Sequence, residues 1–214
     1  MTVRLAISVE GPTEREFCRE VLQPHLHAFG VWMEPKIVVT KRNLRAADDK
    51  GGAVSVERIA TEVRPLLASF DWVTTFYDFH GFRGREVGES PDALCERIAA
   101  RLDRPRKLLP YVQVYEFEAL LFAMPQIVGD FLECPAVAGE MSDAVALCGG
   151  AEQVNDGVRT TPSRRLEKAF MDHLRQRYDK QFHGPLLLME IGLASIRAAC
   201  PRFETWLTRL ESLE

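Results

Sequence analysis

The chain is poor in cysteine and has no long hydrophobic run. Its five cysteines are widely scattered, without a C-x-x-C pair, which argues against both a disulfide framework and a zinc site. No segment approaches the roughly 18 consecutive apolar residues of a membrane span. The N-terminus also lacks the basic flank, apolar run and cleavage site of a secretory signal. These absences predict a cytoplasmic protein without a membrane partner.

The chain also lacks an excess of positive charge and the motifs of several enzyme classes. The formal net charge is -4 and the isoelectric point is about 5.8, so the overall charge does not indicate nucleic-acid binding. No GxxxxGK(S/T) motif is present, which excludes an NTPase of the P-loop class. No serine or cysteine has the sequence context of a catalytic nucleophile. Because a local basic groove can coexist with an acidic metal site, individual patches must be considered separately.

What the chain does contain suits one globular domain with a substantial core. Of its 214 residues, 46% are hydrophobic and 27% are charged. Strand-like and helix-like segments alternate, which predicts an α/β fold with a mostly parallel sheet flanked by helices. From about residue 125 onward the pattern is helical. We therefore expect a single domain over residues 1–214 with a helical C-terminal portion.

The first segment predicts a strand, a tight turn and a helix start. Apolar residues alternate over residues 3–9, and Gly11 with Pro12 interrupts the pattern. Thr13 and Glu16 have the spacing of a capping box at a helix N-terminus. Glu10 therefore lies at the carboxyl end of a strand, where ligands bind in open parallel α/β sheets. Glu14 either joins such a site or only interacts favourably with the helix dipole.

Later segments predict further strands and helices. Ser90 and Pro91 have the residue types of an N-cap and a first helical position. Pro24 is expected to kink or end the first helix. The apolar residues 186–189 suit a strand or a buried helix start, and two short helices divided at residues 200–201 complete the chain. The remaining predictions are strands over residues 31–41, 71–78 and 108–115, and helices over residues 54–68, from 90 and from 161 toward 178.

Acidic residues follow several of the predicted strands. Asp78 ends the strand over residues 71–78, and Glu116 and Glu118 follow the strand over residues 108–115. Together with Glu10 they would converge on one edge of the sheet and repel one another, so a cation is expected there. Oxygen ligands suit Mg²⁺ or Mn²⁺. Such a metal can orient a phosphodiester and activate water for attack.

Basic residues form two candidate contacts for phosphate. The segment over residues 161–165 predicts a helix N-terminus that favours an anion, with Ser163, Arg164 and Arg165 as donors and Lys180 joining them. The alternative is a capped surface helix whose arginines pair with nearby acids. Lys41 and Arg42 lie in a polar loop that either closes over a polyanion or is an exposed connector.

Four strings of residues carry a family resemblance. They are residues 9–14 (VEGPTE), 115–122 (YEFEALLF), 162–166 (PSRRL) and 191–193 with 200–203 (IGL and CPRF). The chain resembles an uncharacterised bacterial family of short Toprim-like proteins, related to the Toprim domains of OLD-family nucleases. The resemblance spans nearly the whole chain. It implies a Toprim-like fold, a metal-dependent nuclease activity, and a link to partner ATPases and bacterial anti-phage defence.

His80 departs from the broader Toprim pattern, in which an Asp-x-Asp pair ends the later strand. His80 stands where the second acid is expected, after Asp78. An imidazole is a poorer Mg²⁺ ligand than a carboxylate, though Mn²⁺ accepts it. His80 is alternatively a general base, a phosphate contact or only a turn residue.

Two classes of function remain open from the sequence. One is a nuclease acting on DNA or RNA, with Glu10, Asp78 and His80 as the catalytic residues. A nucleotide or phosphate-ester hydrolase would need the same metal ligands. The other is a non-catalytic accessory module for a partner ATPase, since fold does not determine function. A homodimer is compatible with either.

Overall fold

The computed structural model describes residues 2–38, 54–155, 157 and 159–214, and its centre is a parallel sheet. In the described part of the chain the strand order is β2-β1-β3-β4, and β5 also pairs with β3. All of these pairs are parallel. The strands are β1 Val3–Val9, β2 Val31–Ile37, β3 Trp72–Asp78, β4 Leu108–Leu109 and β5 Val112–Gln113. The predicted α/β class is confirmed.

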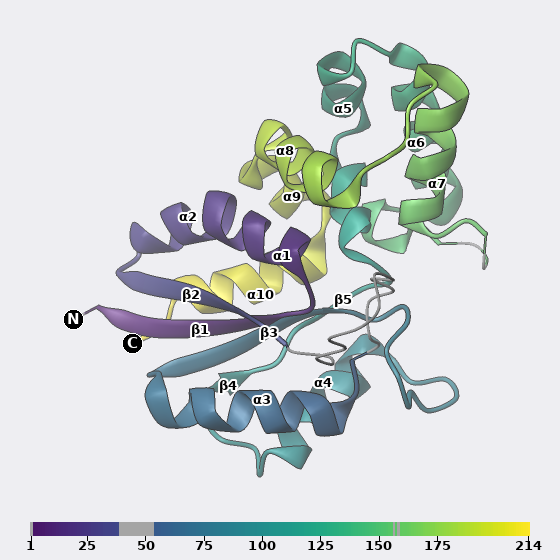
Figure 1. The fold of residues 1–214 in the computed structure, drawn as a ribbon. Coiled ribbons are helices and arrows are strands. Elements are labelled where there is room, and N and C mark those ends of the chain that lie inside the picture. The colour runs from purple at the N-terminus through teal and green to yellow at the C-terminus, as the bar shows by residue number, and fades with distance from the viewer. Residues whose placement is uncertain (1, 39–53, 156, 158) are drawn as a thin grey trace, which may run out of the picture.

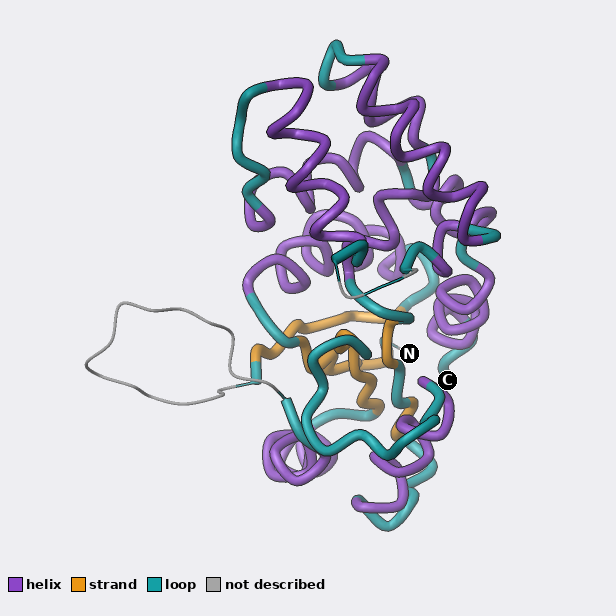
Figure 2. Tube along the Cα trace, turned by 90° about the vertical axis from the view of Figure 1, so that its right-hand side faces the viewer, coloured by secondary structure: helices purple, strands orange, loops and turns teal. Residues whose placement is uncertain are grey.

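Helices cover both faces of this sheet (Figures 1 and 2). One face carries α3 Val56–Ser69 and α4 Pro91–Arg101. The other face carries α1 Pro12–Phe17, α2 Gln23–His27 and α10 Pro201–Glu211. Period-2 alternation in β1 produces this arrangement, because Leu5 and Ile7 belong to the core on the α1 side, whereas Ala6 belongs to the core on the α3 side.

The helical portion follows a buried 3-10 helix and returns to the sheet at its end. The 3-10 helix is Phe117–Ala123. The helices after it are α5 Pro125–Phe131, α6 Pro135–Cys148, α7 Pro162–Ala169, α8 Lys180–Ile191 and α9 Leu193–Ala199. They gather at one end of the molecule, and α10 then lies along the sheet (Figure 1). Trp206 of α10 donates a hydrogen bond to Thr74 Oγ1 at 2.9 Å, so the last helix belongs to the sheet layers.

Several local predictions are confirmed. The Ser90 side chain accepts a hydrogen bond from the Ala93 N–H and caps α4, with Pro91 in its first turn. The division of the last two helices at Cys200 and Pro201 is also observed. The apolar stripe predicted for the last helix is buried, namely Phe203, Trp206, Leu207 and Leu210.

Other local predictions are wrong. The N-cap of α1 is Gly11, and Thr13 lies inside the helix, so the capping box does not form. The alternative that Pro24 ends the helix is wrong, because the chain stays helical to His27; the π-helical turn Cys18–Leu22 distorts it directly before the proline. Pro110 divides the predicted strand over residues 108–115 into β4 and β5. Of the two alternatives for residues 186–189, the strand is wrong, because these residues lie inside the helix α8 and not at its start.

In the described ranges no helix is both long enough and apolar enough to cross a membrane. All five cysteines are free thiols, with Cys18 and Cys200 buried.

Candidate functional site

The carboxyl ends of β1 and β3 bring two predicted acids to one edge of the sheet. Val9 pairs with Phe76 in the parallel register of these strands. Glu10 follows β1 directly, and Asp78 is the last residue of β3. Because both chains run in the same direction, the two carboxylates meet beside the N-terminus of α1. The sequence-based expectation for these two residues matches this placement.

Two further acids and one lysine complete the group. Lys180 is the first residue of α8, and its Nζ lies 3.4 Å from Glu14 Oε1, 3.7 Å from Asp78 Oδ2 and 3.4 Å from Glu118 Oε2. Glu10 lies within electrostatic reach of Glu14, Glu118 and Lys180. We call Glu10, Glu14, Asp78 and Glu118 the acidic cluster. It contains four carboxylates, and Lys180 is the cation among them.

The members of the acidic cluster differ in exposure. The Glu118 side chain is 1% exposed, Glu14 is 5% exposed and Asp78 is 13% exposed, whereas Lys180 is 40% exposed. Neither carboxylate oxygen of Glu118 accepts a hydrogen bond from the residues that the structure describes. A buried carboxylate without such bonds is unfavourable unless a cation or a proton compensates it.

Burial and mutual repulsion shift the protonation of these groups. Burial, together with the Glu14 charge, raises the pKa of Glu10 from 4.5 to about 7, although Lys180 opposes this. Burial also raises the pKa of Asp78 and of Glu118. Burial disfavours the ammonium of Lys180, but the surrounding carboxylates outweigh it and hold its pKa well above the usual value. These shifts show that four carboxylates around one lysine favour an added positive charge, either a proton or a further cation.

Backbone geometry positions Glu118 and Lys180. Asp78 Oδ1 accepts a hydrogen bond from the Phe117 N–H at 2.7 Å, which ties the 3-10 helix to the end of β3. A Cβ on Gly184 would lie 3.2 Å from Thr13 Cγ2 and 3.3 Å from Phe117 Cε1. Glycine thus lets α8 approach α1 closely, about one turn after Lys180.

Glu116, a predicted metal ligand, makes a contact at the start of α7. Its Oε2 accepts a hydrogen bond from the Ser163 N–H at 2.9 Å, at the N-terminus of α7. The amide that was predicted to bind phosphate therefore binds a carboxylate of the same chain. Glu116 also lies close enough to Glu118 to raise the pKa of that residue.

The predicted basic residues are distributed over different places. Arg164 pairs with Glu167 at 2.7 Å, and Arg165 Nε donates to the Thr160 carbonyl. The contact of Arg164 matches the alternative in which the arginines pair with nearby acids, whereas the contact of Arg165 is with a backbone carbonyl. Lys180 joins the carboxylates of the acidic cluster. Lys41 and Arg42 lie outside the described residues.

His80 is exposed just beyond Asp78. Its backbone N–H donates to the Tyr115 carbonyl at 2.6 Å. No hydrogen bond or ion pair joins its imidazole to the described part of the chain. Among the described residues, no group of three or more His, Cys, Asp or Glu side chains has an arrangement that would hold a metal ion. Lys180 is the cation that the acidic cluster contacts directly.

Sequence reasoning did not assign two members of this arrangement. For Glu14 the sequence leaves the two alternatives open, and the signal for the site is its place in the first turn of the helix that follows Glu10. The sequence predicts a phosphate contact for Lys180. Its place among the carboxylates is not predicted, because nothing local in the sequence indicates that α8 packs against α1.

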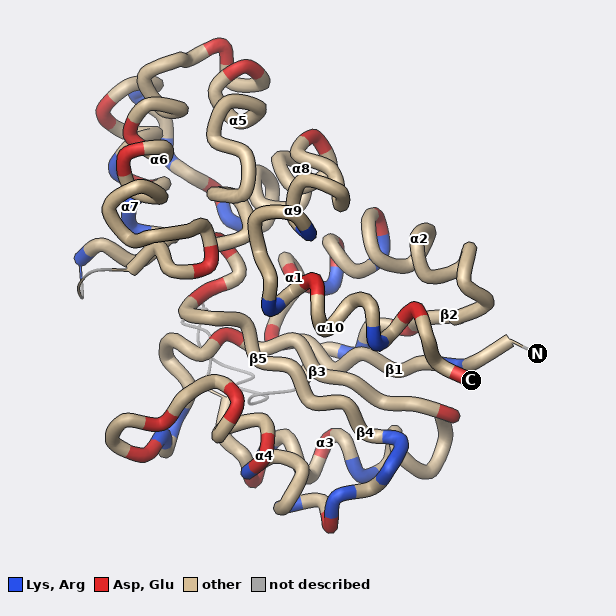
Figure 3. The backbone as a smooth tube through the Cα atoms, turned by 180° about the vertical axis from the view of Figure 1, so that it is seen from behind, with Lys and Arg blue, Asp and Glu red and all other residues tan. Residues whose placement is uncertain are grey.

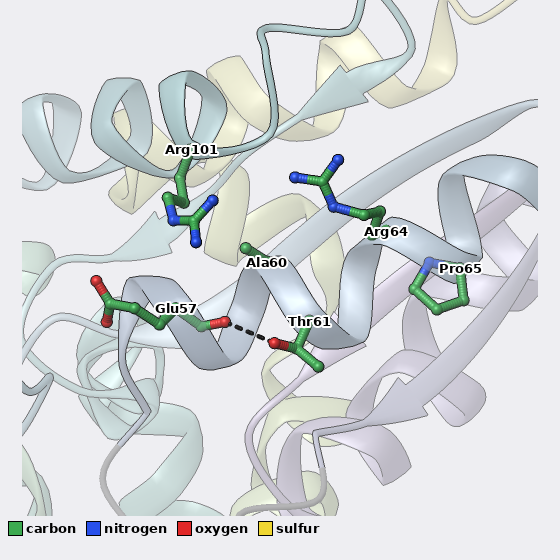
Figure 4. Close-up of a pocket in the computed structure, with 6 residues that line it drawn as sticks. All are labelled: Glu57, Ala60, Thr61, Arg64, Pro65 and Arg101. Atoms are coloured by element: carbon green, nitrogen blue, oxygen red, sulfur yellow. Dashed lines mark hydrogen bonds between the residues drawn. The ribbon is translucent and has the colours of Figure 1, made fainter.

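A separate shallow hollow lies between α3 and α4 (Figure 4). Arg64 and Arg101 extend over Ala60, and Arg64 pairs with Asp103 at 3.7 Å. Its lining includes a single acid, Glu57, and no member of the acidic cluster. We do not assign a site to it.

The fold and the acidic cluster define the chain as a parallel α/β protein with acidic side chains gathered at the carboxyl ends of its strands. Residues 9–211 match a family model described as Domain of unknown function (DUF4276). The chain belongs to this family, and the match includes the whole acidic cluster. No curated protein and no solved structure matches the chain.

Proposed function

We propose that the chain is a Mg²⁺- or Mn²⁺-dependent phosphodiesterase of the Toprim-like class that cleaves DNA or RNA. The observation that carries this proposal is the acidic cluster, in which Lys180 balances only part of the charge of four carboxylates. A divalent cation would remove the remaining repulsion. Oxygen-only ligands also match the preference of both metals.

The residues present are chemically suited to such a cation. The two buried oxygens of Glu118 accept no hydrogen bond from the described residues, so a metal ion that replaced Lys180 beside Oε2 would not compete with hydrogen bonds there. As described, these acids surround Lys180 and are not arranged around a metal ion; once Lys180 moves away, Glu10, Asp78 and Glu118 would hold the ion, with Glu14 beside them. The Lys180 side chain is 40% exposed, so its ammonium can turn toward solvent when a divalent ion replaces it. The bound metal would neutralise the phosphodiester and lower the pKa of an attacking water.

The chain's own groups would then position the substrate. The Phe117 N–H holds Asp78 in one orientation through Oδ1, which leaves Oδ2 directed toward the rest of the acidic cluster. Lys180, once displaced, lies at the rim of the site and would contact a phosphate oxygen. His80 is our candidate for the general base, because it is exposed two residues after Asp78.

The Toprim-like relationship and the link to bacterial defence belong to the same proposal. The string over residues 9–14 contributes Glu10 and Glu14, and the string over residues 115–122 contributes Glu118. Residue 163, from the PSRRL string, donates to Glu116. Residues from three of the four strings thus lie at or beside one site, which supports a shared activity. The partner ATPase follows from the resemblance alone.

Cleavage of labelled single- and double-stranded DNA and RNA tests the proposed activity. We expect cleavage by the purified chain with Mg²⁺ or Mn²⁺ and none with EDTA. Glu10→Gln and Asp78→Asn should abolish it, while Glu20→Gln, an exposed acid on the same helical segment, should not. Retained cleavage in folded Glu10→Gln and Asp78→Asn variants would contradict the proposal.

A second candidate function is a non-catalytic accessory module for an ATPase. It is favoured by the contacts of Lys180, which place a resident cation among the acids, and by the histidine at position 80. Mn²⁺ binding separates the two. A working site gains about 2.7 kcal/mol of stability at a metal concentration of about 100 Kd, and Glu118→Gln should reduce that gain. Absence of any stabilisation by Mn²⁺ or Mg²⁺ would favour the accessory module.

A further inference from the structure

A groove runs along the open edge of the sheet, and no member of the acidic cluster lines it. β4 and β5 form this edge, with α4 on one face of the sheet and α10 on the other. Residues from α4, from the segment before β4, from β4 itself and from α10 line a cavity of about 780 Å³. Figure 3 shows basic segments before β4 and along α10.

Four arginines line this groove, and three of them are available to a ligand. Arg104, Arg106 and Arg209 are exposed, and no hydrogen bond or ion pair ties their guanidinium groups to the described residues. Arg202 is anchored by Asp92 and by the Val112 carbonyl, to which its Nε donates at 3.3 Å.

The groove has a net positive charge. Asp92 and Glu96 are the acids of its lining, against four arginines, in a chain whose formal net charge is -4. The charge of the groove is thus opposite in sign to that of the whole molecule. We call it the arginine groove.

The backbone of this edge does not suit an added peptide strand. Strand addition needs free main-chain donors and acceptors along the edge. Pro110 has no N–H, the Tyr111 N–H donates to Thr75 Oγ1 at 2.8 Å, and the Val112 carbonyl accepts from Arg202. The exposed guanidinium groups are the charged donors along this edge, and they match phosphate oxygens in geometry and charge.

We propose that the arginine groove binds the phosphate backbone of a nucleic-acid strand. Tyr111 is 2% exposed and Trp206 is 5% exposed, so these rings do not offer faces on which bases could stack. Recognition by phosphate contacts alone does not depend on base sequence. The proposal extends the function proposed above to a second, non-catalytic contact with the same class of substrate.

The groove also leads toward the acidic cluster. Leu108 pairs with Val73 near the start of β3, and Gln113 pairs with Asp78 at its end. Val73 and Asp78 are five residue steps apart along β3, a distance of about 17 Å. A strand held by Arg104 and Arg106 would therefore extend along the edge toward Asp78. This guiding role rests on the proposed phosphodiesterase function, whereas binding in the groove does not.

Fluorescence anisotropy with a labelled oligothymidylate in EDTA tests the binding without cleavage. We expect the triple variant Arg104→Gln/Arg106→Gln/Arg209→Gln to bind at least about tenfold more weakly. The salt dependence of binding should also weaken. The negative slope of log K against log salt should become shallower by about 2, because the variant loses three phosphate contacts and each contributes about 0.7 on a single strand. The corresponding triple lysine variant should restore part of the affinity, since it keeps the charge.

Matched variants separate this proposal from the catalytic one. Arg19→Gln/Lys36→Gln/Arg58→Gln removes the same charge elsewhere and should leave binding nearly unchanged. Glu10→Gln should also retain binding, so a failure of catalysis does not remove this signal. No binding by the unmodified chain, equal losses in the two triple glutamine variants, or equal competition by polyglutamate would overturn the proposal.

Discussion

Lys180 is the residue that makes the acidic cluster tolerable in the folded chain. Its ammonium contacts three carboxylates, two of which, Glu14 and Glu118, are almost fully buried. The same three acids raise its pKa, so it stays charged throughout the physiological range. Removing the ammonium would leave buried carboxylates facing one another without a cation.

Lys180→Met should therefore destabilise the protein in a pH-dependent way. Methionine keeps much of the side-chain volume but removes the charge. At pH 8 we expect a loss of about 1–3 kcal/mol, less than for a fully buried pair because Lys180 is 40% exposed. The loss should shrink toward pH 5 as the acids bind protons. Urea unfolding in EDTA measures it.

Lys168→Met is the matched control for this change. Lys168 is 63% exposed and pairs with Glu140 and Asp172 on the surface, so its loss should cost less than about 1 kcal/mol. Equal effects of the two substitutions would contradict the role assigned to Lys180.

The raised pKa of Glu10 gives the free energy of unfolding a second dependence on pH. Its pKa is about 7 in the folded protein, against 4.5 for the ordinary side chain. Below pH 4.5 both the folded and the unfolded states are protonated, so Glu10 has no effect there. Between pH 4.5 and 7 the unfolded state releases its proton first, so the free energy of unfolding falls as pH rises. Above pH 7 this loss is complete.

Glu10→Gln should remove this contribution. We expect the variant to be more stable than the unmodified chain by about 1–3 kcal/mol at pH 8 in EDTA, and equal to it at pH 4. Denaturant unfolding across this range measures the difference, with Glu20→Gln as the exposed control. A variant that is less stable at pH 8 would show that the ionised Glu10 is stabilising.

At the scale of elements, close helix packing explains where the helical portion lies. A Cβ on Gly129 of α5 would lie 2.5 Å from the Ala138 Cβ of α6 and 3.3 Å from the Cys134 carbonyl. These two helices therefore touch through a glycine. Such a contact depends on the pair of positions, and neither helix reveals it in its own pattern.

Gly129→Ala should destabilise the chain through this contact. The added methyl group has no space, and overpacking of this kind typically costs about 1–3 kcal/mol. Ala138→Gly should relieve part of the loss, so the double variant should be more stable than the sum of the single effects predicts. Denaturant unfolding of the three variants gives this coupling energy.

Gly139, which follows Ala138 in α6, provides the control. A Cβ on Gly139 meets no atom within 4 Å, so Gly139→Ala should be neutral or stabilise α6 by up to about 1 kcal/mol. A loss at Gly139 as large as that at Gly129 would contradict the packing argument.

For the whole molecule, one hydrophobic core joins the sheet and the helical portion. Phe76 of β3 and Phe17 of α1 belong to the same cluster as Val137 and Met141 of α6. The Phe76 and Trp206 rings stack with centroids 5.5 Å apart. Residues from β3, α6 and α10 therefore bury one continuous surface, which favours unfolding as a single unit.

A fragment that ends at residue 124 should consequently fail to fold. It would retain every strand of the described sheet together with α1 and α2, but lose α10 and the helical portion that completes the core on the α1 side. We expect a single coincident transition by fluorescence and circular dichroism for the full chain. For the fragment we expect no cooperative transition, and dye binding to exposed apolar surface. A cooperatively folded fragment would show that the helical portion is a separate unit.

The sequence by itself determined the local features of this protein. Alternating apolar residues predicted β1, the serine and proline at 90 and 91 predicted the start of α4, and the acids after two strands predicted Glu10 and Asp78 at one edge. These signals succeed because strand pleating, helix capping and parallel strand direction act over a few residues. The strings over residues 9–14 and 115–122 likewise indicated the neighbourhood of the acidic cluster.

Only the tertiary structure decided which groups meet across long sequence separations. Lys180 reaches Asp78 because Gly184 lets α8 approach α1, and Glu116 turns to the Ser163 amide because α7 begins beside it. Nothing in the residues near either position indicates these contacts, since they follow from how distant helices pack. Burial then raised the pKa of Glu10, because desolvation depends on every element that covers the carboxylate.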